Sequence, residues 1–104
     1  MSSEKPEIPN SLNEHWMPFS SNRDFKANPR LITEAKGVYL KNHQGQTQID
    51  ASSGLFCNPL GHGREEIINA VTNQLRKLDY AQPFQQGFGG SFELATKIAK
   101  HTPG

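Results

Sequence analysis

The most informative part of the sequence is residues 51–71, ASSGLFCNPLGHGREEIINAV. Here a loop of small and apolar residues leads into an amphipathic segment. The loop contains Phe56, Cys57 and His62 together with three glycines, Gly54, Gly61 and Gly63. A loop of this composition before a helix can hold a metal, bind a phosphate, carry a nucleophile or form the wall of another site.

The segment after the loop has the period of a helix, and we predict a helix over residues 64–78. Its apolar face consists of Ile67, Ile68, Val71, Leu75 and Leu78. Acidic residues stand in the first turn and basic residues in the last, and both placements are favourable for the helix dipole. A glycine-rich break follows, and a second helix is predicted from about Ser91, as its N-cap, to His101.

Upstream of the loop, residues 31–35, 38–41 and 46–50 are predicted to be three short strands of an antiparallel meander that packs against helices. Gly37 and Gly45 provide the turns between them. The predicted fold class is therefore α+β, a short three-stranded antiparallel meander plus two helices, and the loop that leads from Ala51 into the helix at residues 64–78 is predicted to be a buried apolar loop.

Two domain boundaries follow from the same pass along the chain. Residues 1–13 are polar and without period, and we expect a mobile tail there; residues 14–104 form one lobe. Within the lobe, residues 15–25 are predicted to be irregular. Their large apolar side chains are Trp16, Met17, Phe19 and Phe25. We favour the interpretation that these side chains pack on the chain's own sheet over the alternative that they face a substrate pocket or a second subunit.

Composition excludes several classes of function. The 104 residues carry a net charge of +1 without a basic cluster, so no nucleic-acid partner is expected. No apolar stretch reaches the length of a membrane span and no signal peptide is visible, so we expect a cytoplasmic protein with no membrane partner. The single cysteine, Cys57, rules out an internal disulfide.

No complete catalytic set is visible in the sequence. Cys57 and His62 are five residues apart with no second ligand pair, so no metal site is predicted. A packed thiol is favoured over a Cys57 nucleophile. Glu65 and Glu66 place negative charge where a phosphate would bind, so His62 is interpreted as a packing or capping residue in the turn that enters the helix.

The motifs, in their order along the chain, resemble the class III, fold-type I aminotransferases that use pyridoxal 5'-phosphate, and most closely the ω-amino acid:pyruvate (β-alanine:pyruvate) branch. The resemblance covers residues 15–104. It rests on HWMPF and NRDF, the hairpin return from Gly45 to Asp50, SGLFC, GHGREEI, LDY and SFELA followed by TPG. In two places this chain departs from the pattern: Phe56 stands where Trp is usual, and Gly87-Phe88-Gly89 stands for Gly-His-Pro.

The resemblance implies a fragment of a transaminase that moves an amino group from an ω-amino acid or amine to pyruvate. By this resemblance, the sequence stops before the segment that binds the cofactor phosphate and before the Schiff-base lysine. No catalytic or cofactor-binding residue is therefore assigned, and the chain alone is expected to be inactive. It also implies a homodimer or higher homo-oligomer. The implied substrate-binding residues are Phe19, Leu55, Phe56, Tyr80 and Phe84.

Two alternatives stay open beside the transaminase fragment. The chain can be a stand-alone interaction module that docks on a full-length aminotransferase or another partner. It can also be a small cysteine enzyme, which requires a reactive Cys57.

Overall fold

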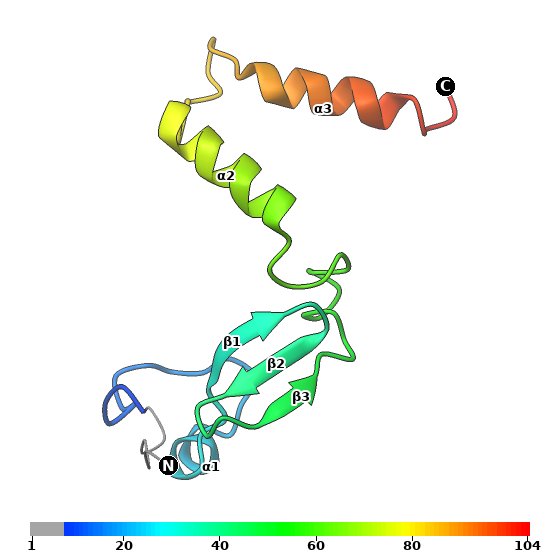
Figure 1. Ribbon diagram of the computed structural model, residues 1–104. Helices are drawn as coiled ribbons and strands as arrows, with labels where there is room; N and C mark the ends of the chain where they lie inside the picture. Colours follow the sequence, from blue (N-terminus) through cyan, green and yellow to red (C-terminus); the bar gives the residue numbers. More distant parts are fainter. Residues whose placement is uncertain (1–7) are drawn as a thin grey trace. The chain divides into compact units, whose positions relative to one another are not determined.

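The computed structural model describes residues 8–104, which divide into two compact units, one ending at Glu65 and the other spanning Glu66–Gly104. The first unit contains α1 (Asn22–Ala27), β1 (Ile32–Lys36), β2 (Tyr39–Asn42) and β3 (Thr47–Ile49) (Figure 1). The second unit contains α2 (Glu65–Lys77), apart from its first residue, and α3 (Gly89–Ala99). The α+β prediction is confirmed. The tail prediction falls partly on residues 1–7, outside the described residues; residues 8–13 form no helix or strand.

The three strands form an antiparallel sheet in the order β1-β2-β3, as predicted, with each boundary shifted by one residue. Tyr39 pairs with both Lys36 and Ile49, so the middle strand joins the two outer ones. Both turns use a glycine in the left-handed region, Gly37 at φ +59° and Gly45 at φ +79°. Glycine adopts this conformation without a steric penalty, which explains why short strands can turn so tightly here.

The chain returns to the first turn of the sheet after the loop. His62 N–H donates to the Gly37 carbonyl and Gly37 N–H donates to the His62 carbonyl, each at 2.8 Å. Gly61, at φ +86°, precedes the bridge, and a Cβ at this position would lie 3.3 Å from the Gly37 oxygen. The close approach of the two backbones therefore depends on a glycine at residue 61.

Helix α1 was not predicted, because a six-residue helix is too short to show an apolar period. The sequence does contain one feature typical of a helix N-terminus, a serine, Ser21, three residues before an acidic residue, Asp24. The Ser21 hydroxyl donates to Asp24 Oδ2 at 2.7 Å, which ties the residue before the helix to its first turn.

Asn22, in the first turn of α1, is the only residue among residues 8–104 that is buried as a whole, with 7% of its surface exposed. Its Oδ1 accepts from Met17 N–H at 2.7 Å, and its Nδ2 donates to the carbonyls of Met17 at 2.9 Å and Ser20 at 3.2 Å. These bonds close the turn in which Phe19 adopts φ +49° and points its ring fully into solvent. One amide thus fixes the backbone of a strained aromatic residue.

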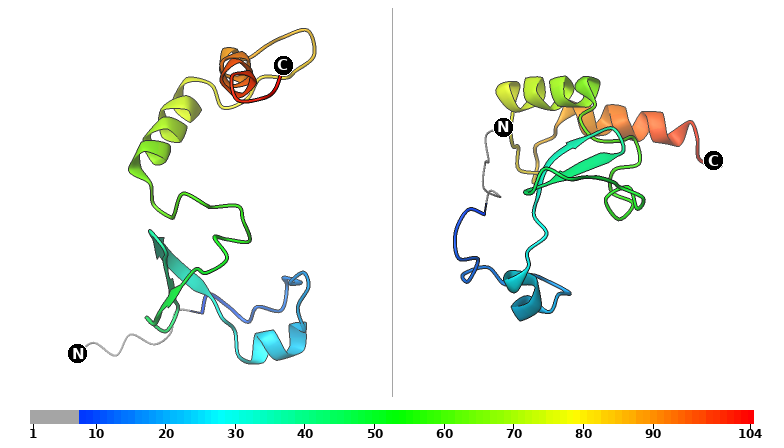
Figure 2. Two further views of the ribbon diagram at one scale, coloured as in Figure 1. Left: turned by 90° about the vertical axis from the view of Figure 1, so that its right-hand side faces the viewer. Right: turned by 60° about the horizontal axis from the view of Figure 1, so that its bottom comes forward.

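Helices α2 and α3 are separate rods joined by the loop at residues 78–88, and they do not pack on each other (Figures 1 and 2). Helix α3 begins at Gly89 rather than Ser91, and the prediction that Ser91 caps it is wrong. The Ser91 hydroxyl instead donates to the Phe88 carbonyl at 2.7 Å. The Phe88 ring occupies the space that a Cβ at residue 90 would need, so Gly90 allows the helix to begin two residues early.

No apolar side chain is buried anywhere in residues 8–104. The apolar stripe predicted for α2 exists, but its members, Ile67 and Val71 among them, are about half exposed. Trp16 and Phe19 are also exposed, so the interpretation that they pack on the chain's own sheet is wrong. Backbone and polar hydrogen bonds, rather than an apolar core, define this structure.

We expect the isolated 104-residue chain to unfold without a cooperative transition and to bind the dye ANS strongly at neutral pH, because its apolar side chains are exposed. Circular dichroism during a thermal melt, with ANS fluorescence at each temperature, measures both properties. A sharp transition without dye binding would contradict this description of the surface.

Replacing Asn22 with alanine should release the turn at residues 17–20, since both polar backbone groups of Met17 lose their partner. The expected cost is about 1–3 kcal/mol, measured as faster hydrogen exchange of the Met17 amide. Asn28→Ala, at the exposed end of the same helix, is the matched control and should leave that exchange rate unchanged. Equal rates in both variants would remove the role assigned to Asn22.

Candidate functional site

The loop at residues 51–61 contains a left-handed turn of four consecutive residues. The φ angles are +51° for Ser53, +60° for Gly54, +56° for Leu55 and +67° for Phe56. For each non-glycine residue this conformation costs about 1–2 kcal/mol relative to the right-handed region. Two backbone hydrogen bonds close the turn, from Phe56 N–H to the Ser52 carbonyl at 2.9 Å and from Asn58 N–H to the Ser53 carbonyl at 2.8 Å.

The turn presents two apolar side chains to solvent. Leu55 is 74% exposed and Phe56 is 84% exposed, so the expectation of a buried apolar loop is wrong for this chain. The turn therefore offers a leucine and a phenylalanine as an exposed apolar surface.

Asp50, directly after β3, organises this turn. Its Oδ1 accepts from Gly54 N–H at 3.0 Å and from the Ser52 hydroxyl at 3.3 Å, and its Oδ2 faces His62 Nε2 at 2.8 Å. The side chain is only 7% exposed. The Gly54 N–H first, and the His62 ring second, hold the pKa of the Asp50 carboxyl below its usual value of 3.8.

His62 connects Asp50 to the far end of the loop. The Asn58 amide Nδ2 lies 2.7 Å from His62 Nδ1, and since an amide nitrogen can only donate, Nδ1 accepts. The ring hydrogen is then on Nε2 and is donated to Asp50. His62 thus belongs to the turn before the helix, as interpreted, but through two specific hydrogen bonds of its ring.

Sequence reasoning did not single out Asp50 and Asn58 as members of this network. A signal was present, because Asp50 stands shortly before Ser52-Ser53-Gly54, and aspartate, serine and glycine are residues that favour turns, aspartate by accepting hydrogen bonds from nearby backbone N–H groups. Their link to His62 could not be read from the sequence, since it depends on the bridge that returns residue 62 to Gly37.

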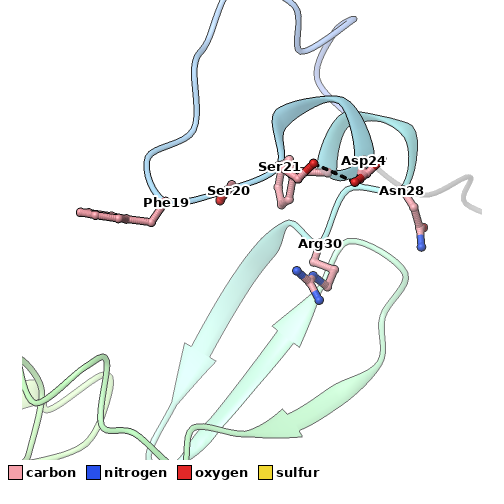
Figure 3. A pocket seen from close by; sticks show the side chains of 7 residues that line it. Phe19, Ser20, Ser21, Asp24, Asn28 and Arg30 are labelled. Atoms are coloured by element: carbon pink, nitrogen blue, oxygen red, sulfur yellow. Dashed lines mark hydrogen bonds between the residues drawn. The ribbon is translucent and has the colours of Figure 1, made fainter.

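Phe19 lies on a different segment of the same unit, at the rim of a hollow of about 400 Å³ beside α1. Figure 3 shows its ring turned away from the other lining residues, which include Asp24 and Arg30. Neither Leu55 nor Phe56 lines this hollow. The structure therefore places Phe19 and the left-handed turn as two separate apolar features.

Tyr80 and Phe84 lie in the second unit, in the loop between α2 and α3, and both are exposed. Gln85, next to Phe84, adopts φ +58°. Among residues 8–104, the non-glycine residues with positive φ are Leu12, Phe19, Ser53, Leu55, Phe56 and Gln85. Three of these six are predicted substrate-binding residues and a fourth adjoins one, and strained backbone of this kind concentrates at functional sites.

Cys57 follows the turn and is exposed, so the prediction of a packed thiol is wrong. Its Sγ lies 3.6 Å from the Leu55 carbonyl oxygen, while the His62 ring uses both nitrogens toward Asp50 and Asn58. The geometry does not form the Cys–His pair that a cysteine enzyme needs. Residues 8–104 contain no group of three His, Cys, Asp or Glu side chains that could hold a metal. None of the helices in the same part of the chain has the length and hydropathy of a membrane-spanning helix.

Comparison with known proteins identifies the family. Residues 20–104 match the class III aminotransferase family. The chain is 48% identical over 94 residues to a β-alanine–pyruvate aminotransferase of Pseudomonas aeruginosa and 47% identical over 93 residues to an ω-amino acid–pyruvate aminotransferase of Pseudomonas putida. These matches cover 90% and 89% of this chain and 21% of each relative, so the chain spans about a fifth of the length of these relatives.

The solved structures agree with this result. An ω-transaminase from Pseudomonas jessenii in complex with PMP superposes with a TM-score of 0.79 at 27% identity, covering 86% of this chain and 20% of that one. The fold and the order of motifs are therefore shared along most of the described residues. This chain belongs to the class III aminotransferases.

Proposed function

We propose that this chain is the N-terminal segment of a transaminase that moves an amino group from an ω-amino acid, such as β-alanine, to pyruvate, and that residues 14–104 are the lobe that shapes its amine-binding side. The observation that carries the proposal is the left-handed turn, which holds Leu55 and Phe56 outward in a chain nearly half identical to a β-alanine–pyruvate aminotransferase. An apolar surface of this kind can contact the carbon chain of an amine donor.

Class III aminotransferases depend on pyridoxal phosphate, and we propose that groups outside the described residues bind it. Lys26 Nζ donates to the Asn13 carbonyl at 3.1 Å and Lys41 pairs with Glu34 at 3.2 Å, while the other described lysines are exposed on strand and helix surfaces. Gly63 is followed by Arg64 and then by Glu65 and Glu66, and the two carboxylates carry a charge unfavourable for a phosphate. The cofactor is therefore assigned to parts of the enzyme beyond this segment, and no chemical step is assigned to these residues.

Phe56 is proposed to limit the size of the amine. The family resemblance places a tryptophan at this position, and phenylalanine keeps an aromatic wall while removing bulk and the indole N–H donor. A Pseudomonas jessenii transaminase with a tryptophan replaced by glycine is described as engineered for asymmetric synthesis of enantiopure bulky amines. By this parallel, Phe56 should accept a larger donor than tryptophan would.

Phe19 is proposed to contribute to the same substrate-binding side, and Tyr80 and Phe84 to reach it at the interface of a homodimer or higher oligomer. All three are exposed aromatic side chains, and Phe19 lies on strained backbone. Exposed aromatic residues are typical of binding surfaces because they give a large contact area for little conformational entropy.

The exposed apolar side chains also favour a second function, an interaction module that docks on a full-length aminotransferase or another partner. The two functions differ in the size of the natural product. The transaminase proposal predicts a polypeptide several times larger than 11.6 kDa, detected by immunoblot with an antibody against residues 64–80, that converts β-alanine and pyruvate into the corresponding semialdehyde and alanine. A product of 11.6 kDa without this activity would replace the proposal with the interaction module.

In that full-length enzyme, Phe56→Ala should raise kcat/KM for an arylalkyl amine relative to β-alanine by about tenfold, and Phe56→Trp should lower the same ratio. The physical reason is that side-chain volume at residue 56 competes with the bulk of the donor. Leu60→Ala, an exposed apolar residue of the same loop outside the turn, is the control and should leave the ratio unchanged. A parallel change of kcat/KM for both donors in the Phe56 variants would remove Phe56 from the specificity site.

A further inference from the structure

We propose that Asp50, His62 and Asn58 form a clamp that positions the left-handed turn, and that this clamp sets amine specificity through the placement of Leu55 and Phe56. The inference rests on the proposed function and deepens it, because it names residues that act on the pocket without touching substrate. The observation behind the inference is the set of hydrogen bonds that Asp50 makes to Ser52, Gly54 and His62.

The turn needs an external support. Ser53, Leu55 and Phe56 all occupy the left-handed region, and neither side chain of the apolar pair is packed against the rest of the described chain. A left-handed backbone is stable at non-glycine residues only where the surrounding interactions outweigh its conformational cost. The burial that usually provides such support is missing here, so polar bonds must provide it.

The Asp50 carboxylate provides that support at two points of the turn. It accepts from the Ser52 hydroxyl, where the turn begins, and from Gly54 N–H, inside it, at 3.3 and 3.0 Å. A hydrogen bond to a charged acceptor is stronger than one between neutral groups. The Asp50 carboxylate thus fixes the orientation of the Gly54 peptide, which precedes the two apolar residues.

The clamp is itself fixed to the sheet. Asp50 N–H donates to the Val38 carbonyl and His62 N–H to the Gly37 carbonyl, both at 2.8 Å. Both clamp residues are therefore held by consecutive residues of one β-turn. The side-chain bond of 2.8 Å between Asp50 and His62 then closes the loop across its two ends.

Asn58 completes the arrangement by setting the tautomer of His62. Its amide donates to Nδ1, so the ring hydrogen stays on Nε2 and points at Asp50. Both ring nitrogens are occupied and the Asp50 side chain is almost completely covered, so neither group is available to a substrate. These are positioning residues, and their effect should appear as a change in selectivity.

The test uses the full-length enzyme with two amine donors, β-alanine and an arylalkyl amine. Asp50→Ala should change the ratio of the two kcat/KM values by about tenfold, since Phe56 moves relative to the reacting centre, and should accelerate hydrogen exchange of the Gly54 amide. Asp50→Asn should restore only part of the ratio, because its Oδ1 can still accept from Gly54 while its Nδ2 faces the N–H donor of His62 Nε2. Glu34→Ala, an exposed carboxylate on β1, is the matched control and should change neither readout.

Asn58→Ala gives a second, milder variant should Asp50→Ala fail to fold, and it should shift the donor ratio in the same direction by a smaller factor. A uniform loss of activity with both donors, at a constant ratio, would overturn the clamp while leaving the proposed function intact. A parent enzyme that transaminates neither donor would overturn the proposed function itself, so the two failures are distinguishable.

Discussion

The hydrogen bond between Asp50 and His62 is the constraint on which the loop depends. Both residues are attached through their backbone to one β-turn of the sheet, and their side chains meet across a loop of eleven residues, 51–61. Without this bond the segment between them would be a flexible connection rich in glycine and serine. With it, four consecutive residues adopt a left-handed turn and two apolar side chains take defined positions.

A similar construction occurs at the other predicted site residue of the same unit. Asn22 uses both ends of its amide to hold the turn that contains Phe19, as Asp50 uses both carboxylate oxygens around Phe56. In each case a covered polar side chain fixes an exposed aromatic residue with positive φ. Polar bonds have directional geometry, so they can define a backbone where no apolar packing is available.

The second main feature of the described residues, 8–104, is that they contain no buried apolar core. Their apolar side chains are exposed. The chain corresponds to about a fifth of the length of its relatives, and the additional residues of a full-length relative can cover such side chains. Exposed apolar faces on both helices and on the turn lower the free energy only when something else buries them. The described residues therefore combine exposed apolar side chains with a local geometry that is set by hydrogen bonds.

The sequence by itself determined the three strands, both longer helices, the glycine turns and the family, because periodicity, turn residues and motif order are local properties. It did not reveal α1, which is shorter than an apolar period, or the start of α3, where Gly90 leaves room for the Phe88 ring. Tertiary structure alone decided that Leu55 and Phe56 face outward and that Asp50, Asn58 and His62 form one network. The reason is that a bridge between residues 37 and 62 creates these contacts, and pairing over such a separation depends on how the chain folds back rather than on its neighbours in sequence.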